Sequence, residues 1–136
     1  METMTLDNDI RAFYVAARSF PDGVLEAHQK LHSLVPLSTD RKYFGVSRPE
    51  NGGGIAYKAA AEELQEGEAE QLNCPTLVLK KGKYICQAIN DYMKNIPAIG
   101  STFQQLLSNP DIDPDGYCLE WYLNDKDLKC MVRLKD

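Results

Sequence analysis

The sequence predicts an α+β fold made of two βαββ halves related by a pseudo-twofold axis. Runs of β-branched and aromatic residues alternate with two amphipathic segments, so each half reads strand, helix, strand, strand. The spacing repeats as well, because Tyr43 follows Val24 by 19 positions and Tyr117 follows Ala98 by the same 19. Each half leaves one face of a small antiparallel sheet uncovered by its helix, and we expect these faces to form a central ligand cleft.

The first half spans about residues 8–62. Its elements in order are a strand, a helix and two strands, expected at residues 10–18, 23–35, 42–48 and 55–61. Pro36 ends the helix, and a glycine-rich turn at residues 49–54 joins the last two strands. The acidic residues 62–71 are expected to form an exposed connection or a short additional element.

The second half spans about residues 75–136. Its strands are expected at residues 76–79, 83–89, 117–123 and 128–134. Residues 80–82 form a turn or bulge between the first two, and residues 124–127 form the turn of a closing hairpin. Pro97 suits the first position of a helix, whose apolar face carries Phe103 and Leu106.

The composition fits one compact domain, residues 1–136, with 43% hydrophobic and 26% charged residues. The net charge of −5 argues against a phosphate-binding surface, because proteins that bind nucleic acids concentrate Lys and Arg. The first strand is expected near Ile10, which leaves no room before it for a helix-turn-helix region. We therefore expect no DNA-binding domain and no direct binding of nucleic acid.

The N-terminus and the cysteines predict the cellular environment. Residues 1–9 are polar and lack the apolar core of a signal peptide, and no apolar run is long enough to cross a bilayer. The four cysteines form no Cys-x-x-Cys pair, which argues against structural zinc. The sequence predicts a cytoplasmic protein with free thiols, no membrane association, no metal and no cofactor.

A carboxylate surrounded by aromatic residues marks the candidate site. Glu120 lies in a predicted strand beside Trp121 and Tyr122. A buried carboxylate is costly unless its charge is compensated, and a cation stacked on aromatic faces would compensate it. This arrangement points to a cationic ligand.

The cross-strand register decides which face of the sheet Glu120 occupies. A short turn at residues 124–127 predicts that Glu120 pairs with Met131. Glu120 then shares a face with Lys129 and Arg133, and one interpretation is a solvated ion pair with either of them. The opposite face would be uniformly apolar and would lie under the helices; it would carry Tyr117, Leu119, Trp121, Leu123, Leu128, Cys130, Val132 and Leu134.

Several segments, in order, resemble the GyrI-like domain, also called the bacterial transcription-activator effector-binding domain. They are residues 43–49 (YFGVSRP), the glycine-rich turn with Ile55-Ala56-Tyr57, residues 81–84 (KGKY) and residues 119–123 (LEWYL). The resemblance covers about residues 8–135. It implies two strand–helix–strand–strand halves and a central cleft that binds lipophilic, cationic, drug-like small molecules.

The resemblance also implies a set of ligand-binding residues. The family glutamate that meets the positive charge of the ligand maps onto Glu120, Tyr122 matches the motif tyrosine, and Tyr57 matches a second lining tyrosine. Further lining candidates are Tyr43, Phe44, Tyr84 and Cys118, the last as an inert thiol.

Three functions are compatible with this sequence. The first is a cation-binding module that sequesters a drug or reports it to a separate regulatory protein. The second is hydrolysis of strained cyclopropane-containing compounds, as in some stand-alone GyrI-like proteins, with Glu120 as the general base. The third is a protein-binding inhibitor that uses the acidic residues 62–70. A homodimer could form through exposed sheet edges.

Two histidines lie one helical turn apart, at His28 and His32, which is a spacing that metal ligands use. No third ligand is apparent nearby in the sequence. His28 also falls among the apolar positions Val24, Leu31 and Val35, so the pattern favours a partly buried helix histidine over a metal site.

Overall fold

The computed structural model describes residues 1–50 and 53–136, so residues 51 and 52 of the expected turn at 49–54 lie outside the described residues. The elements in order are β1 (Glu2–Leu6), β2 (Ile10–Ala16), α1 (Val24–Leu34), β3 (Tyr43–Pro49), β4 (Ile55–Glu62), α2 (Glu68–Gln71), β5 (Thr76–Leu79), β6 (Gly82–Ile89), η1 (Tyr92–Lys94), α3 (Pro97–Leu107), β7 (Cys118–Tyr122) and β8 (Leu128–Arg133).

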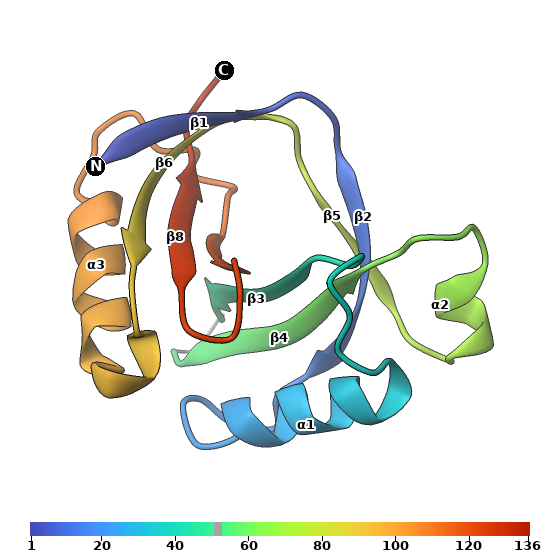
Figure 1. Cartoon of the computed structure of the whole chain (residues 1–136). Coiled ribbons are helices and arrows are strands. Elements are labelled where there is room, and N and C mark those ends of the chain that lie inside the picture. Colours follow the sequence, from blue (N-terminus) through green and yellow to red (C-terminus); the bar gives the residue numbers. More distant parts are fainter. Residues whose placement is uncertain (51–52) are drawn as a thin grey trace.

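The strands form one antiparallel sheet in the order β1-β6-β8-β7-β3-β4-β2-β5. Its inner six strands repeat one pattern about the β7–β3 pair, because β6-β8-β7 mirrors β2-β4-β3. The sheet curls into a half-barrel, and α1 and α3 pack on its outside (Figure 1). The predicted α+β fold with duplicated βαββ halves is confirmed, and the two expected small sheets are joined into one.

The two edge strands are exchanged between the halves. β1 precedes β2 in the chain but pairs with β6, so that Met4 lies opposite Tyr84. β5 precedes β6 but pairs with β2, so that Arg11 lies opposite Val78. The expectation that the first strand begins near Ile10 was therefore wrong. The sequence pattern did not predict β1, because Leu6 is its only buried residue and its other residues show no apolar pattern.

The register of the closing hairpin differs by one residue from the prediction. Glu120 lies opposite Cys130, and Leu119 lies opposite Met131. Leu123 lies opposite Asp127 and not opposite Leu128, because its N–H donates to the Asp127 carbonyl over 2.9 Å and Asn124 Oδ1 accepts the backbone N–H groups of Lys126 and Asp127. A slip of one residue moves every side chain to the other face, so Glu120 shares its face with Leu128, Cys130 and Val132.

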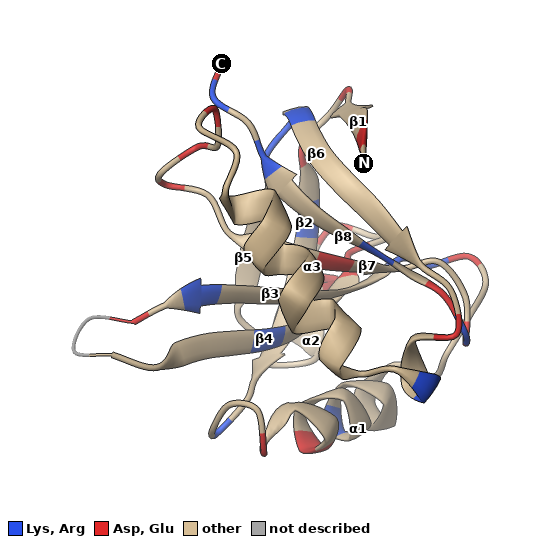
Figure 2. Cartoon of the chain, turned by 90° about the vertical axis from the view of Figure 1, so that its left-hand side faces the viewer, with Lys and Arg blue, Asp and Glu red and all other residues tan. Residues whose placement is uncertain are grey.

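Each face of the curled sheet has its own apolar core. On the inner face Phe44, Leu119 and Met131 pack in one cluster. On the outer face α1 covers one half through Ala27 and Leu31, and α3 covers the other half through Phe103 and Leu106. α3 carries no Lys, Arg, Asp or Glu along its length, unlike α1 (Figure 2).

The acidic segment is tied to arginines of this same chain. It contains the short helix α2, whose Ala69 is buried. Arg41 bonds Glu68 in a bidentate pair with distances of 2.8 and 2.7 Å, and Arg11 lies 3.2 Å from Glu63. Three of the acidic groups are thus internally paired, because Glu62 also lies 3.7 Å from Lys42. No helix among the described residues is long and apolar enough to cross a membrane.

Candidate functional site

Glu120 lies at the centre of the sheet, where the two outer clusters meet. Its strand β7 runs between β3 and β8, and its cross-strand partners are Gly45 and Cys130. Its neighbour on the same face, Tyr122, packs against both the cluster under α1 and the cluster under α3. Glu120 therefore sits at the seam between the helices and not on a solvated face beside Lys129 and Arg133, as one sequence interpretation expected.

Two tyrosines bind one oxygen of the Glu120 carboxylate. Tyr122 donates to Oε1 over 2.6 Å and Tyr57, from β4, donates to the same oxygen over 2.8 Å. Burial raises the pKa of Glu120, and the two tyrosine hydrogen bonds oppose this because they favour the charged form. The pKa of Tyr57 is raised by burial and by the adjacent negative charge, so its hydroxyl remains a donor.

Gly45 makes room for this arrangement. A Cβ at this position would overlap Tyr57 Oη and Glu120 Oε1, and would lie only 2.8 Å from Tyr57 Cζ. Real Cβ atoms essentially never approach other atoms so closely. The missing side chain is therefore what lets the carboxylate and the phenol meet above β3.

His28, on α1, extends the hydrogen-bonded group. Its Nε2 lies 2.8 Å from Tyr57 Oη and 3.4 Å from Tyr122 Oη. Burial lowers the pKa of His28 from 6.5 to about 4, with a smaller contribution from the positive charge of His32. The imidazole is therefore neutral at neutral pH.

A third tyrosine and two thiols complete the surroundings of Glu120. Tyr92, from η1, packs against Tyr122 with ring centroids 5.7 Å apart. Burial and the charge of Glu120 together raise the pKa of Cys118 to about 11 and that of Cys130 to about 12. Both cysteines are therefore protonated and unreactive at neutral pH.

The two carboxylate oxygens of Glu120 differ in their surroundings. Oε1 accepts both tyrosine hydrogen bonds, whereas Oε2 has no hydrogen-bond partner in the described part of the chain. His32 Nδ1 is the only fully buried side-chain N or O atom without a partner among the described residues, so Oε2 is not sealed from solvent. No Lys, Arg or His side chain of residues 1–50 and 53–136 forms an ion pair with Glu120.

The structure brings together four of the residues proposed from sequence: Glu120, Tyr122, Tyr57 and Cys118. It places two others elsewhere. Phe44 packs edge-on against Trp121 inside the curl, with ring centroids 5.3 Å apart. Tyr84 is fully buried in the same inner cluster and donates to the backbone oxygen of Lys80. Alternation along β3 and β6 puts both rings on the face opposite Glu120.

Tyr43 is on the outer face but serves a different contact. Its hydroxyl accepts from the Ser38 N–H over 2.9 Å and donates to the Pro36 carbonyl over 3.2 Å. Its ring meets His32 edge-on, with centroids 5.1 Å apart. Tyr43 thus fixes the segment that follows α1.

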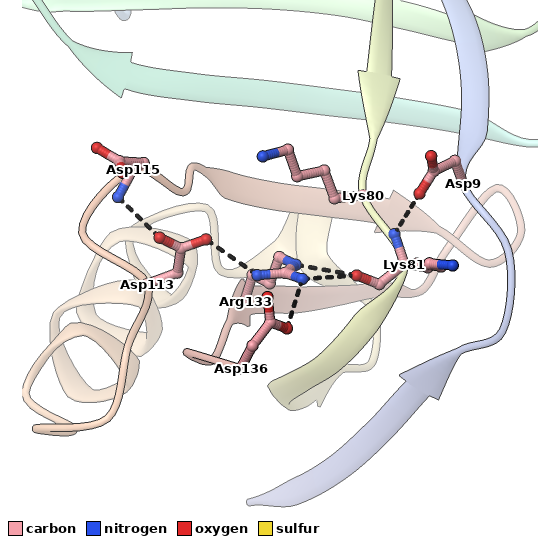
Figure 3. A pocket seen from close by; sticks show the side chains of 7 residues that line it. All are labelled: Asp9, Lys80, Lys81, Asp113, Asp115, Arg133 and Asp136. Carbon is pink, nitrogen blue, oxygen red and sulfur yellow. Dashed lines mark hydrogen bonds and ion pairs between the residues drawn. The ribbon is translucent and has the colours of Figure 1, made fainter.

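Two open hollows lie away from the Glu120 carboxylate. One of about 440 Å³ is lined by charged groups around Arg133, which bonds Asp113, Asp136 and the Lys81 carbonyl (Figure 3). The other, of about 390 Å³, includes Phe20 and Tyr57, whose rings stack with centroids 5.9 Å apart. Tyr57 thus connects the second hollow with the carboxylate. No group of three or more His, Cys, Asp and Glu side chains in the described residues is arranged to hold a metal ion.

Sequence reasoning missed the roles of Gly45, His28 and Tyr92. His28 was placed correctly on the apolar face of its helix, but helical spacing does not show which strand residues it meets. Gly45 lies in residues 43–49, one of the segments that resemble the GyrI-like domain. Only the pairing of β3 with β7 shows that it lies opposite Glu120. Tyr92 had no signal, because its position depends on the connection from β6 to α3.

The sequence has no significant match to a protein-family model or to a curated protein. Solved structures nevertheless share its fold along nearly its whole length. An integron cassette protein from the mobile metagenome of Vibrio cholerae matches with a TM-score of 0.71 and 12% identity, over 98% of this chain and 95% of its own. The protein SAV2435 bound to tetraphenylphosphonium matches with a TM-score of 0.68 and 10% identity, over 98% and 93%.

A third match is a protein from Staphylococcus aureus MU50 whose description as a bacterial transcription regulation protein is provisional. Its TM-score is 0.64 and its identity 11%, over 99% of this chain and 97% of its own. This chain has the GyrI-like fold. The resemblance seen in the motifs is thus confirmed at the level of the fold. One protein with this GyrI-like fold binds a lipophilic cation, and another is described as a regulator of transcription.

Proposed function

We propose that this GyrI-like protein binds lipophilic organic cations at Glu120, in the seam between α1 and α3. The observation that carries the proposal is a carboxylate held by two tyrosines and lacking a basic partner among the described residues. Desolvating a charge without a partner is unfavourable, so a bound cation would supply what the fold leaves out.

The aromatic side chains around Glu120 suit the same ligand class. Tyr122 and Tyr92 pack against each other beside the carboxylate and are only partly buried, so their rings can meet a group that lies against Glu120. Cation–π attraction contributes about 0.5–2 kcal/mol for each well-placed ring. The binding of tetraphenylphosphonium by SAV2435, a protein of the same fold, supports this assignment. Such a module would sequester the cation or present it to a separate regulatory protein.

Titration with tetraphenylphosphonium by calorimetry tests the proposal. We expect the wild-type protein to bind, and Glu120→Gln to bind at least about tenfold more weakly, because the amide keeps the shape but not the charge. Glu63→Gln is the matched control, since it removes another buried carboxylate that Arg11 already pairs. The neutral compound triphenylphosphine oxide controls for apolar binding.

Two outcomes would contradict the assignment. Equal affinity of Glu120→Gln and the wild type for tetraphenylphosphonium would show that the carboxylate does not contribute to binding. Equal affinity of the wild type for the phosphonium ion and for triphenylphosphine oxide would show that charge plays no part.

A further inference from the structure

The hydrogen bonds around Glu120 leave one acceptor open. Oε1 already accepts two short bonds, from Tyr122 over 2.6 Å and from Tyr57 over 2.8 Å. Oε2 accepts none from the described residues and is not sealed from solvent. A ligand that reaches this carboxylate therefore meets a single free oxygen.

The donors of the same group are all in use. Tyr57 Oη has one proton and lies 2.8 Å from both Glu120 Oε1 and His28 Nε2. The carboxylate is the stronger acceptor, so it takes this proton. His28 then serves as the donor, with its proton on Nε2 directed at the Tyr57 oxygen. The hydrogen-bonded group consequently offers an incoming ligand an acceptor and no spare donor.

We infer that the preferred ligand is a protonated tertiary amine, whose single N–H donates to Glu120 Oε2. This inference rests on the proposed function and specifies the class of cation. A quaternary ammonium or phosphonium ion neutralises the carboxylate but leaves Oε2 without a hydrogen bond. The nitrogen of a primary ammonium directs only one N–H at Oε2, so its two other N–H groups lose their water without a new acceptor on this carboxylate.

A series of three cations with one aromatic group tests the inference. The naphthylmethyl group is joined to a dimethylammonium, a trimethylammonium or an unsubstituted ammonium centre, and each compound is titrated by calorimetry near neutral pH. We expect the dimethylammonium compound to bind about tenfold more tightly than either of the others, which is the size of one charge-assisted hydrogen bond. The trimethylammonium compound binding as tightly as its dimethyl counterpart would overturn the inference.

Tyr122→Phe gives a second test within the same series. Removing this hydroxyl frees a lone pair on Oε1, so the primary ammonium compound gains an acceptor and its disadvantage should shrink severalfold. Tyr84→Phe is the matched control, because its hydroxyl is also hydrogen-bonded but lies in the inner cluster. An affinity ratio of the dimethylammonium to the primary ammonium compound that is the same in Tyr122→Phe as in the wild type would contradict an acceptor-limited site.

The two proposals fail in different ways. If none of the three compounds binds and tetraphenylphosphonium does not bind either, the proposed function itself is wrong. If all bind with similar affinity and Glu120→Gln weakens them equally, the site is a cation site and only the preference for one N–H is wrong.

Discussion

Gly45 shows how a residue without a side chain shapes the candidate site. It lies opposite both Ala59 and Glu120 in the sheet. The space above it is filled by Tyr57 Oη and Glu120 Oε1. Two tyrosine hydroxyls thus hold the carboxylate over β3, in the space that a side chain at position 45 would fill. The identity of Glu120 alone does not predict this arrangement.

Gly45→Ala should separate the carboxylate from Tyr57 without removing either group. The added Cβ would overlap both polar atoms, so one side chain must move and the 2.8 Å hydrogen bond must break. We expect a loss of about 1–3 kcal/mol in the free energy of unfolding and a weaker affinity for tetraphenylphosphonium. Urea denaturation and calorimetry measure the two effects.

Gly100→Ala is the matched control for that substitution. Gly100 lies in α3, and a Cβ there meets nothing within 4 Å. Alanine should stabilise the helix by about 0.5–1 kcal/mol and leave cation binding unchanged. If Gly45→Ala also proved neutral for both stability and binding, the close packing over β3 would be contradicted.

His28 should make stability depend on pH. Its pKa is about 4 in the folded protein and 6.5 in the unfolded chain, so the unfolded chain binds more protons between these values. The free energy of unfolding should therefore be fully developed above pH 6.5 and fall by up to about 2–3 kcal/mol as the pH drops towards 4.

His28→Gln isolates this contribution. Glutamine keeps an N–H for Tyr57 but does not titrate, so its unfolding free energy should decline less over the same pH range. Urea denaturation of both proteins at several pH values between 4 and 7 measures the difference. Parallel pH profiles for the two proteins would show that His28 is not held neutral by burial.

Among the elements, β1 depends most on its partners. Four of its five residues are polar or only partly buried. Leu6 is its one buried residue, 7% exposed in the inner core, and Met4 packs at the edge of the same cluster. It forms because β6 provides a ladder of backbone partners from Cys86 to Gly82. Local sequence does not encode such a strand.

Leu6→Ala tests the place of β1 in the core. Removing a buried leucine side chain should cost about 2–4 kcal/mol of unfolding free energy, whereas Asp7→Ala, at an exposed position just beyond the strand, should cost less than about 0.5 kcal/mol. Thermal or urea unfolding measures both. Similar small effects from the two substitutions would mean that β1 is not packed as described.

At the scale of the whole molecule, the exchanged edge strands bind the halves together. β1 completes the second half through β6, and β5 completes the first half through β2. The halves also share the central β3–β7 pair, in which Gly45 faces Glu120. The candidate site therefore belongs to neither half alone.

Separate expression of residues 8–62 and residues 75–136 tests this dependence. The first fragment lacks the partner strands β5 and β7, and the second lacks β1 and β3, so each exposes unpaired strand edges. We expect each fragment alone to be largely unfolded by circular dichroism and to show no cooperative thermal transition. Cooperative unfolding of either fragment by itself would show that the halves are independent.

The sequence by itself determined the two βαββ halves and both long helices, and it singled out Glu120, Tyr122 and Tyr57, which the structure brings together. These features depend on local periodicity and on motifs, which short stretches of chain carry in full. The sequence did not determine the face that Glu120 occupies, because the turn around Asn124 places Leu123 opposite Asp127 and not opposite Leu128. Since side chains alternate along a strand, this shift of one residue in the register puts Glu120 on the opposite face of the sheet.

Only the tertiary structure decided which residues surround the carboxylate. Phe44 and Tyr84 are as aromatic as Tyr57, yet the curl of the sheet places them in the inner core. His28, Gly45 and Glu120 come from α1, β3 and β7, and their contact exists only after distant strands pair. Hydrophobic patterning specifies that a side chain is buried, whereas its neighbours are fixed by long-range pairing and packing.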